Sequence, residues 1–144
     1  GTVIDHIPFG QALNVLRILK IKGEEGYTIA MVMNVKSRKL GKKDVVKVEG
    51  RELAPGEADR IALVAPDATI STIKNYRVEK KMKVRMPGKI EGILKCINPN
   101  CISNKPGEPL TSSFKVLSRT PTLLVCEYCG AYISHDEVVA QYAS

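Results

Sequence analysis

The chain has 144 residues, of which 44% are hydrophobic and 26% charged, with 22 Lys and Arg against 15 Asp and Glu. This is enough apolar material for one domain or two small ones, and no apolar run approaches the roughly 18 residues that span a bilayer. The opening GTVIDHIPFG lacks the basic and then apolar leader of a secreted protein, so we expect a soluble, cytoplasmic protein.

In the first part of the chain, residues 8–23 carry apolar side chains at helical spacing. Phe9, Leu13 and Leu16 fall on one predicted face, joined by Ala12 and Leu19, and Gly23 would end the helix. Residues 27–35 are apolar and β-branched and predict a largely buried strand. A polar turn and a second strand at 45–49 would complete a hairpin.

Further along, Pro55 and the acidic residues that follow it predict a short helix over 54–62. Two apolar runs, 61–66 and 68–73, predict short strands. Residues 76–84 alternate as a strand with one solvated face. The first part of the chain therefore mixes strands with two helices.

Pro87 and Gly88 mark the best candidate for a domain boundary, giving domains 1–88 and 89–144. Residues 1–89 hold 18 Lys and Arg against 10 Asp and Glu, a net charge of +8, whereas residues 90–144 hold 4 against 5, a net charge of −1. The second part is predicted to be small and β-rich. Its expected elements are strands at 92–96, 113–118 and 122–126, and a helical turn or tail at 135–144.

All four cysteines lie in the second part, as Cys96-x4-Cys101 and Cys126-x2-Cys129 separated by 24 residues. Two close thiolate pairs joined by a strand-bearing insert suit one tetrahedral Zn²⁺. Four sulfur ligands close the coordination shell, so the ion would be structural. It would stabilise a module too small to bury much surface by itself.

Two other interpretations of the cysteines are weaker. Disulfides need an oxidising compartment, for which the opening residues give no signal. A thioredoxin-type redox motif would open a helix after a strand, and it would leave the second cysteine pair without a role.

Two basic runs stand out in the first part, KSRKLGKKDVVK and KNYRVEKKMKVR. If they neighbour one another in a sheet, their lysines could converge on a polyanion. The simpler interpretation is that Lys and Arg protect edge strands against aggregation. Lys47, Tyr76 and Lys81 flank apolar positions, which makes them better candidates for lining a pocket.

The chain contains no Ser-His-Asp set, Walker loop, G-x-G-x-x-G motif or cluster of metal-binding histidines, so nothing indicates catalysis. Asp5 before a helix is most often an N-terminal cap, and a lone His6 is more often structural than catalytic.

Two classes of function remain. One is a four-cysteine zinc-ribbon nucleic-acid-binding protein, and the other is a regulatory chain that senses a small anion and docks on a partner through its zinc module. A nucleic-acid-binding ribbon should itself be basic, because phosphate contacts provide most of the affinity. The cysteine-bearing part is slightly acidic, which favours the regulatory chain.

Five stretches, GTVIDHIP, GKKDVVKVE, APDATI, NYRVEKK and CINPNCIS…CEYC, occur in an order that resembles the regulatory chain of aspartate carbamoyltransferase. The resemblance covers essentially the whole chain. It implies an α+β fold with an N-terminal antiparallel sheet backed by two helices. A small C-terminal β-rich zinc-binding domain would follow and dock on the catalytic chain.

The resemblance also implies a function in pyrimidine biosynthesis without catalytic activity. The chain would form homodimers that bridge catalytic trimers. It would hold one zinc ion and bind nucleotide effectors such as CTP and ATP, with UTP as a further candidate. Effector binding would shift the assembly between low- and high-activity states.

Residue by residue, the resemblance implies three sets of positions. Effector contacts would come from Asp5, His6, Lys43, Lys47, Ile73, Tyr76, Val78 and Lys81. Zinc would be held by Cys96, Cys101, Cys126 and Cys129. The catalytic chain would be contacted by Asn98 and Asn100.

Overall fold

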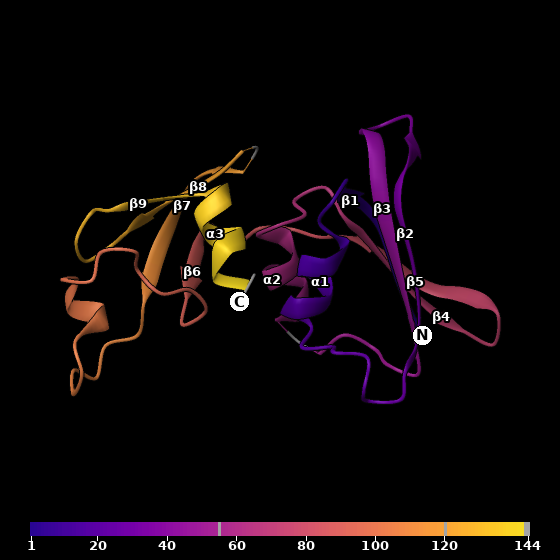
Figure 1. Ribbon diagram of the computed structural model, residues 1–144, viewed down its shortest axis with the longest axis horizontal. Helices are drawn as coiled ribbons and strands as arrows, with labels where there is room; N and C mark the ends of the chain where they lie inside the picture. Colours follow the sequence, from indigo (N-terminus) through magenta and orange to yellow (C-terminus); the bar gives the residue numbers. More distant parts are fainter. Residues whose placement is uncertain (55, 120, 143–144) are drawn as a thin grey trace. The chain divides into compact units, whose positions relative to one another are not determined.

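The computed structural model describes residues 1–54, 56–119 and 121–142, so Pro55, the expected helix start, lies outside the described residues. The chain divides into two compact units, Gly1–Arg85 and Met86–Ser144. We call them the N-terminal and C-terminal units (Figure 1). Among the described residues, no helix has the length and apolar character needed to cross a membrane.

The N-terminal unit is a five-stranded antiparallel sheet in the order β2-β3-β1-β4-β5. Helices α1 and α2 lie on one face of this sheet (Figure 1), which confirms the predicted α+β class. The elements are β1 (Thr2–Pro8), α1 (Ala12–Ile18), β2 (Thr28–Ser37), β3 (Gly41–Glu49), α2 (Glu57–Ala62), β4 (Thr69–Lys74) and β5 (Arg77–Lys83).

The central strand β1 was missed by the sequence analysis, which placed Asp5 and His6 in front of a helix. The pairing of β1 with β3 shifts register between Ile4 and Ile7, so Asp5 and His6 form a bulge. Because the bulge adds one residue, Ile4 and Ile7 both enter the core and are fully buried. Asp5 and His6 are only partly buried.

Helix α1 packs through a face that matches the expected one only in part, since Ala12 and Leu19 are buried as predicted. Ala12, Val15 and Ile18 are buried, whereas Phe9 and Leu13 are 61% and 47% exposed. The helix is apolar on more than one side, so residue spacing alone could not decide which side faces the sheet.

Two predicted strands also differ from the structure. β2 was expected to be largely buried, but it is an edge strand with Met31 and Val32 exposed. Residues 61–66 form the end of α2 and the turn after it. Leu63 and Val64 are nevertheless fully buried, so this apolar run is part of the core without being a strand.

The C-terminal unit is a four-stranded antiparallel sheet in the order β6-β7-β8-β9. Phe114, Leu124, Ile133 and Val138 are fully buried and form its core. The strand expected at 92–96 is a loop that leads to Cys96. The elements are β6 (Lys89–Glu91), η1 (Ile102–Asn104), β7 (Ser113–Arg119), β8 (Thr122–Cys126), β9 (Tyr132–Ser134) and α3 (His135–Tyr142).

Asp44 of β3 joins three elements from a fully buried position. Its Oδ2 accepts a hydrogen bond of 3.0 Å from the Ala12 N–H at the start of α1, and its Oδ1 accepts one of 2.9 Å from the Asn34 N–H in β2. Asp44 therefore caps α1 from the sheet, the role that the sequence had suggested for Asp5.

Replacing Asp44 with Ala should leave the buried Ala12 N–H and the partly buried Asn34 N–H without their acceptor. We expect the free energy of unfolding to fall by roughly 2–4 kcal/mol, measured by urea unfolding of the zinc-loaded chain. Asp67→Ala, at a partly exposed carboxylate, is the control and should change it by less than about 0.5 kcal/mol. Equal effects of the two variants would contradict this account of Asp44.

Candidate functional site

The four cysteines converge at one point of the C-terminal unit. All four sulfur atoms lie within 4.8 Å of one another. The Cys96–Cys129 sulfurs are 3.5 Å apart and the Cys101–Cys126 sulfurs 3.7 Å. Disulfide bonds would bring sulfurs to about 2.05 Å, whereas zinc bonds of about 2.3 Å place tetrahedral sulfurs roughly 3.8 Å apart. The cluster has the dimensions of a zinc site.

Two turns present the sulfur atoms. In the first, the Cys101 N–H donates to the Asn98 carbonyl at 3.0 Å. In the second, the Gly130 N–H donates to the Cys126 carbonyl at 2.9 Å, and Gly130 adopts a φ of 78° that a side chain would strain. Glycine after the last cysteine therefore permits the tight turn.

Burial and backbone donors set the pKa values of the thiols. Burial raises the pKa of Cys96 to about 12, and it also raises that of Cys126. At the exposed end of the cluster, the Ala131 N–H lowers the pKa of Cys129 to about 7. Zinc must displace protons from the buried thiols, so its affinity rises with pH.

The four cysteine ligands determine what chemistry the metal centre can perform. Four cysteine thiolates satisfy all four tetrahedral positions of Zn²⁺ and leave none for a reacting water, so the centre is structural. Three of the four sulfurs belong to buried residues in the core of a small unit. Metal binding there contributes directly to folding.

Asn104 supports this centre and was missed by the sequence analysis. Its Nδ2 donates to the carbonyls of Cys96 and Asn98, at 2.9 Å in each case. It thereby ties η1 to the first cysteine turn. Asn98 accepts the Asn100 N–H on its Oδ1 at 3.0 Å, so part of its side chain is used within the loop, while Asn100 is exposed.

The second candidate site lies on the face of the N-terminal sheet away from the helices, which we call the outer face. Cross-strand pairing aligns Lys47 of β3, Val3 of β1, Ser71 of β4 and Lys81 of β5 in one row. Their neighbours Ile4, Val46 and Ile70 are buried, so alternation directs this row outward.

A cavity of about 370 Å³ opens at one end of this face. Lys47 and Glu49 line it from β3, and their charged groups are 3.2 Å apart. Ile73 and Tyr76 line the opposite side, and residues 1–3 lie between. A volume of this size is typical of small-molecule sites.

The wall at Tyr76 has an unusual backbone. Asn75 and Tyr76 have φ values of 51° and 61°, which makes the β4–β5 connection a two-residue turn with both residues in the left-handed region. Tyrosine rarely takes this conformation, and strained backbone tends to occur at functional positions. The Tyr76 side chain is fully exposed beside the cavity.

A polar cluster lies farther along β1. Lys43 Nζ is 2.9 Å from Asp5 Oδ1, and His6 Nδ1 is 2.7 Å from Thr69 Oγ1. Burial alone would raise the pKa of Asp5, but the Lys43 ammonium and the His6 N–H outweigh it and hold the pKa below its usual value.

The predicted effector residues thus share one face without forming one pocket. Lys47, Ile73 and Tyr76 line the cavity. Val78 pairs with Ile73 beside it, and Lys81 lies two strands from Val3, roughly 10 Å across the sheet. Asp5, His6 and Lys43 form the separate cluster.

Comparison with known proteins gives the same result for both units. Residues 1–85 match the family model of the aspartate carbamoyltransferase regulatory chain, allosteric domain, and residues 88–139 match its metal binding domain. The match to the metal binding domain, together with the cysteine cluster, confirms the prediction of one structural zinc ion.

Several archaeal proteins named aspartate carbamoyltransferase regulatory chain are similar over nearly the whole length. The protein of Korarchaeum cryptofilum is 52% identical over 141 residues, covering 98% of this chain and 90% of its own. That of Hyperthermus butylicus is 57% identical over 143 residues, covering 99% and 89%. That of Thermofilum pendens is 55% identical over 144 residues, covering 100% and 91%.

Removing zinc with a chelator should unfold the C-terminal unit and leave the N-terminal unit folded, because only the former depends on the metal. Amide NMR spectra should lose the dispersed signals of β6–β9 and keep those of β1–β5. Adding zinc back should restore them. Dispersed β6–β9 signals in the metal-free chain would contradict a structural role for zinc.

Asn104→Ala should lower zinc affinity by about tenfold, because outer-shell partners of metal sites typically contribute this much. Competition with a chromophoric chelator measures the effect. Asn100→Ala, at an exposed side chain in the same loop, is the matched control and should keep the original affinity. If both variants match the unmodified chain, Asn104 does not organise the site.

Proposed function

The chain belongs to the family of aspartate carbamoyltransferase regulatory chains, and we propose that it binds a nucleotide effector such as CTP or ATP on its outer sheet face. UTP is a further candidate. The observation that carries this proposal is the position of Lys47, Ile73 and Tyr76 around one cavity, with Lys81 on the same face. Effector binding would shift the assembly between activity states by its differential affinity for them.

The chemistry of the outer face fits a nucleoside triphosphate. Tyr76 and Ile73 offer an exposed ring and an apolar wall to a base. Lys47 and Lys81 offer point charges to phosphates. Asp5 holds a charged carboxylate that can accept hydrogen bonds from ribose hydroxyls, with His6 and Lys43 beside it.

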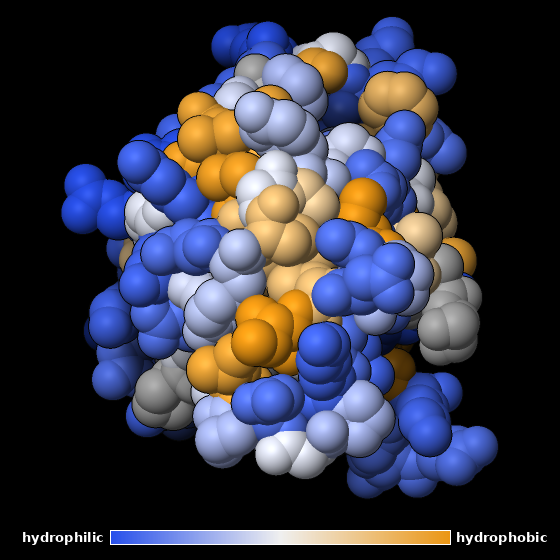
Figure 2. Space-filling view, turned by 90° about the vertical axis from the view of Figure 1, so that its left-hand side faces the viewer, coloured by the Kyte–Doolittle hydropathy of each residue, from blue (hydrophilic) through white to orange (hydrophobic). Residues whose placement is uncertain are grey.

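We propose that the C-terminal unit docks on the catalytic chain and links catalytic trimers. Figure 2 shows apolar side chains exposed among polar ones on one face of the molecule. Ile97 and Ile102 are 44% and 43% exposed beside Asn98 and Asn100 in the cysteine loop. Zinc would fix the shape of this loop and so prepare a docking surface.

We also propose that two copies associate through the N-terminal unit. β2 is an edge strand of 10 residues, and its first eight positions, 28–35, carry no charge. Exposed apolar edge strands favour pairing with another strand. The opposite edge, β5, carries five charged side chains and is protected. The homodimer would therefore form at β2.

The thiolate-rich zinc centre supports a cytoplasmic location, because the reducing cytosol keeps cysteines available to metal.

Lys81→Ala and Lys47→Ala should each weaken CTP or ATP binding by about tenfold, since each removes a charge-assisted contact. Calorimetry on the zinc-loaded chain measures the affinity. Lys80→Ala is the matched control, because Lys80 pairs with Thr72 on the helix-bearing face. Equal losses in all three variants would indicate a general charge effect and remove Lys81 and Lys47 from the site.

A further inference from the structure

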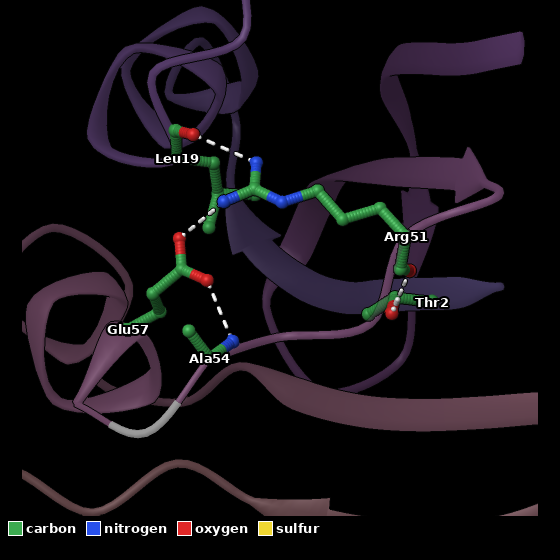
Figure 3. Close-up of polar contacts among 5 residues, drawn as sticks. All are labelled: Thr2, Leu19, Arg51, Ala54 and Glu57. Carbon is green, nitrogen blue, oxygen red and sulfur yellow. Dashed lines mark hydrogen bonds and ion pairs between the residues drawn. The ribbon is translucent and has the colours of Figure 1, made fainter. Parts of the chain in front are cut away.

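Arg51 connects the outer-face cavity to both helices. Its guanidinium Nη1 donates to the carbonyl of Leu19 after α1 at 2.7 Å, and its Nη2 lies 2.7 Å from Glu57 Oε2 at the start of α2 (Figure 3). Its own carbonyl accepts a 2.8 Å hydrogen bond from the Thr2 hydroxyl. One residue therefore contacts β1, α1 and α2.

Gly50 connects the end of β3 to Arg51. β3 ends at Glu49, and Gly50 takes a φ of 85° that turns the chain at the end of the strand. Arg51 is thus fixed to β3 by the backbone and to the helices by its side chain.

The Arg51–Glu57 ion pair is well shielded from water. The two side chains are 22% and 11% exposed, compared with 53% for both Lys74 and Glu52, which form a surface ion pair. The second oxygen of Glu57 accepts the Ala54 N–H at 2.6 Å. Desolvation offsets much of the attraction in such pairs, so their value often lies in fixing a geometry.

Arg51 is also connected to residues that line the cavity. Thr2 and Glu49 both line the cavity. Thr2 is 2% exposed, and its hydroxyl bonds to the Arg51 carbonyl, two residues beyond Glu49. The two strands that form this wall are therefore held to each other and to the helices by Arg51.

We propose that Arg51 is a positioning residue for the nucleotide effector, which it does not touch. By holding the ends of β1 and β3 against α1 and α2, it sets the spacing of the cavity wall. A movement of the helices relative to the sheet then changes effector affinity, and effector binding moves the helices in return. This inference rests on the proposed effector site.

Three variants of the zinc-loaded chain test the proposal, with the dissociation constants of CTP and ATP measured by calorimetry. Arg51→Lys keeps the positive charge. An ammonium group lacks the planar guanidinium whose two nitrogens donate to the Leu19 carbonyl and the Glu57 carboxylate at the same time. The double variant Arg51→Ala with Glu57→Gln removes the ion pair without leaving a buried charge. Thr2→Val removes only the hydroxyl that reaches the Arg51 carbonyl.

All three variants should raise the dissociation constant about five- to tenfold, a typical size for coupling through residues outside a site. The double variant should melt close to the unmodified chain, because no buried carboxylate is left unpaired. Arg60→Ala is the matched control, at a neighbouring arginine of α2, and should bind nucleotide normally.

The outcomes separate the two proposals. If the unmodified chain binds neither CTP nor ATP, the effector site itself is wrong. If it binds and the double variant keeps the affinity of the unmodified chain, Arg51 does not position the effector site and the inference is overturned. Unchanged affinity in all three variants overturns it as well.

Discussion

The central strand β1 has to supply both the core and the outer face of the N-terminal sheet, and the bulge at Asp5 and His6 makes this possible. In a regular strand, Ile4 and Ile7 would point to opposite faces. The extra residue brings both into the core, where they are fully buried. Asp5 and His6 are left among Lys43 and Thr69, which hold their side chains in place. The polar cluster therefore exists because the strand is irregular at this point.

The C-terminal unit depends on its cysteine cluster as well as on its apolar core. Its core is small, and three of its buried residues are cysteines that converge with a fourth at zinc-binding distances. A closed four-thiolate shell gives no reactive position, so the ion contributes shape and stability. Asn104 extends that rigidity from the metal to the loop that carries Asn98 and Asn100. In the proposed function the two units would have separate roles: the N-terminal unit would offer charge and a cavity to a small ligand, and the C-terminal unit would offer a metal-fixed surface to a protein.

The sequence predicted the parts of the structure that depend on local spacing or on family motifs. Cysteine spacing predicted the zinc site, because ligands two or four residues apart can reach one ion from a single turn. β1 was missed because the bulge breaks its alternation. β2 was interpreted as buried because apolar composition cannot distinguish a core strand from an exposed edge. Asn104, Asp44 and Arg51 follow no spacing rule, since their partners are set by tertiary contacts. The effector residues were assigned by resemblance and remain predictions.

The most direct test of the account is the light-scattering mass of the zinc-loaded chain mixed with the catalytic trimer of aspartate carbamoyltransferase, before and after zinc removal. A regulatory chain that docks through its zinc-dependent unit should give a large complex that dissociates when the metal is withdrawn. If zinc-loaded chain and catalytic trimer remain separate, the proposed assembly is contradicted. A complex that survives loss of zinc would contradict the role given to the cysteine centre.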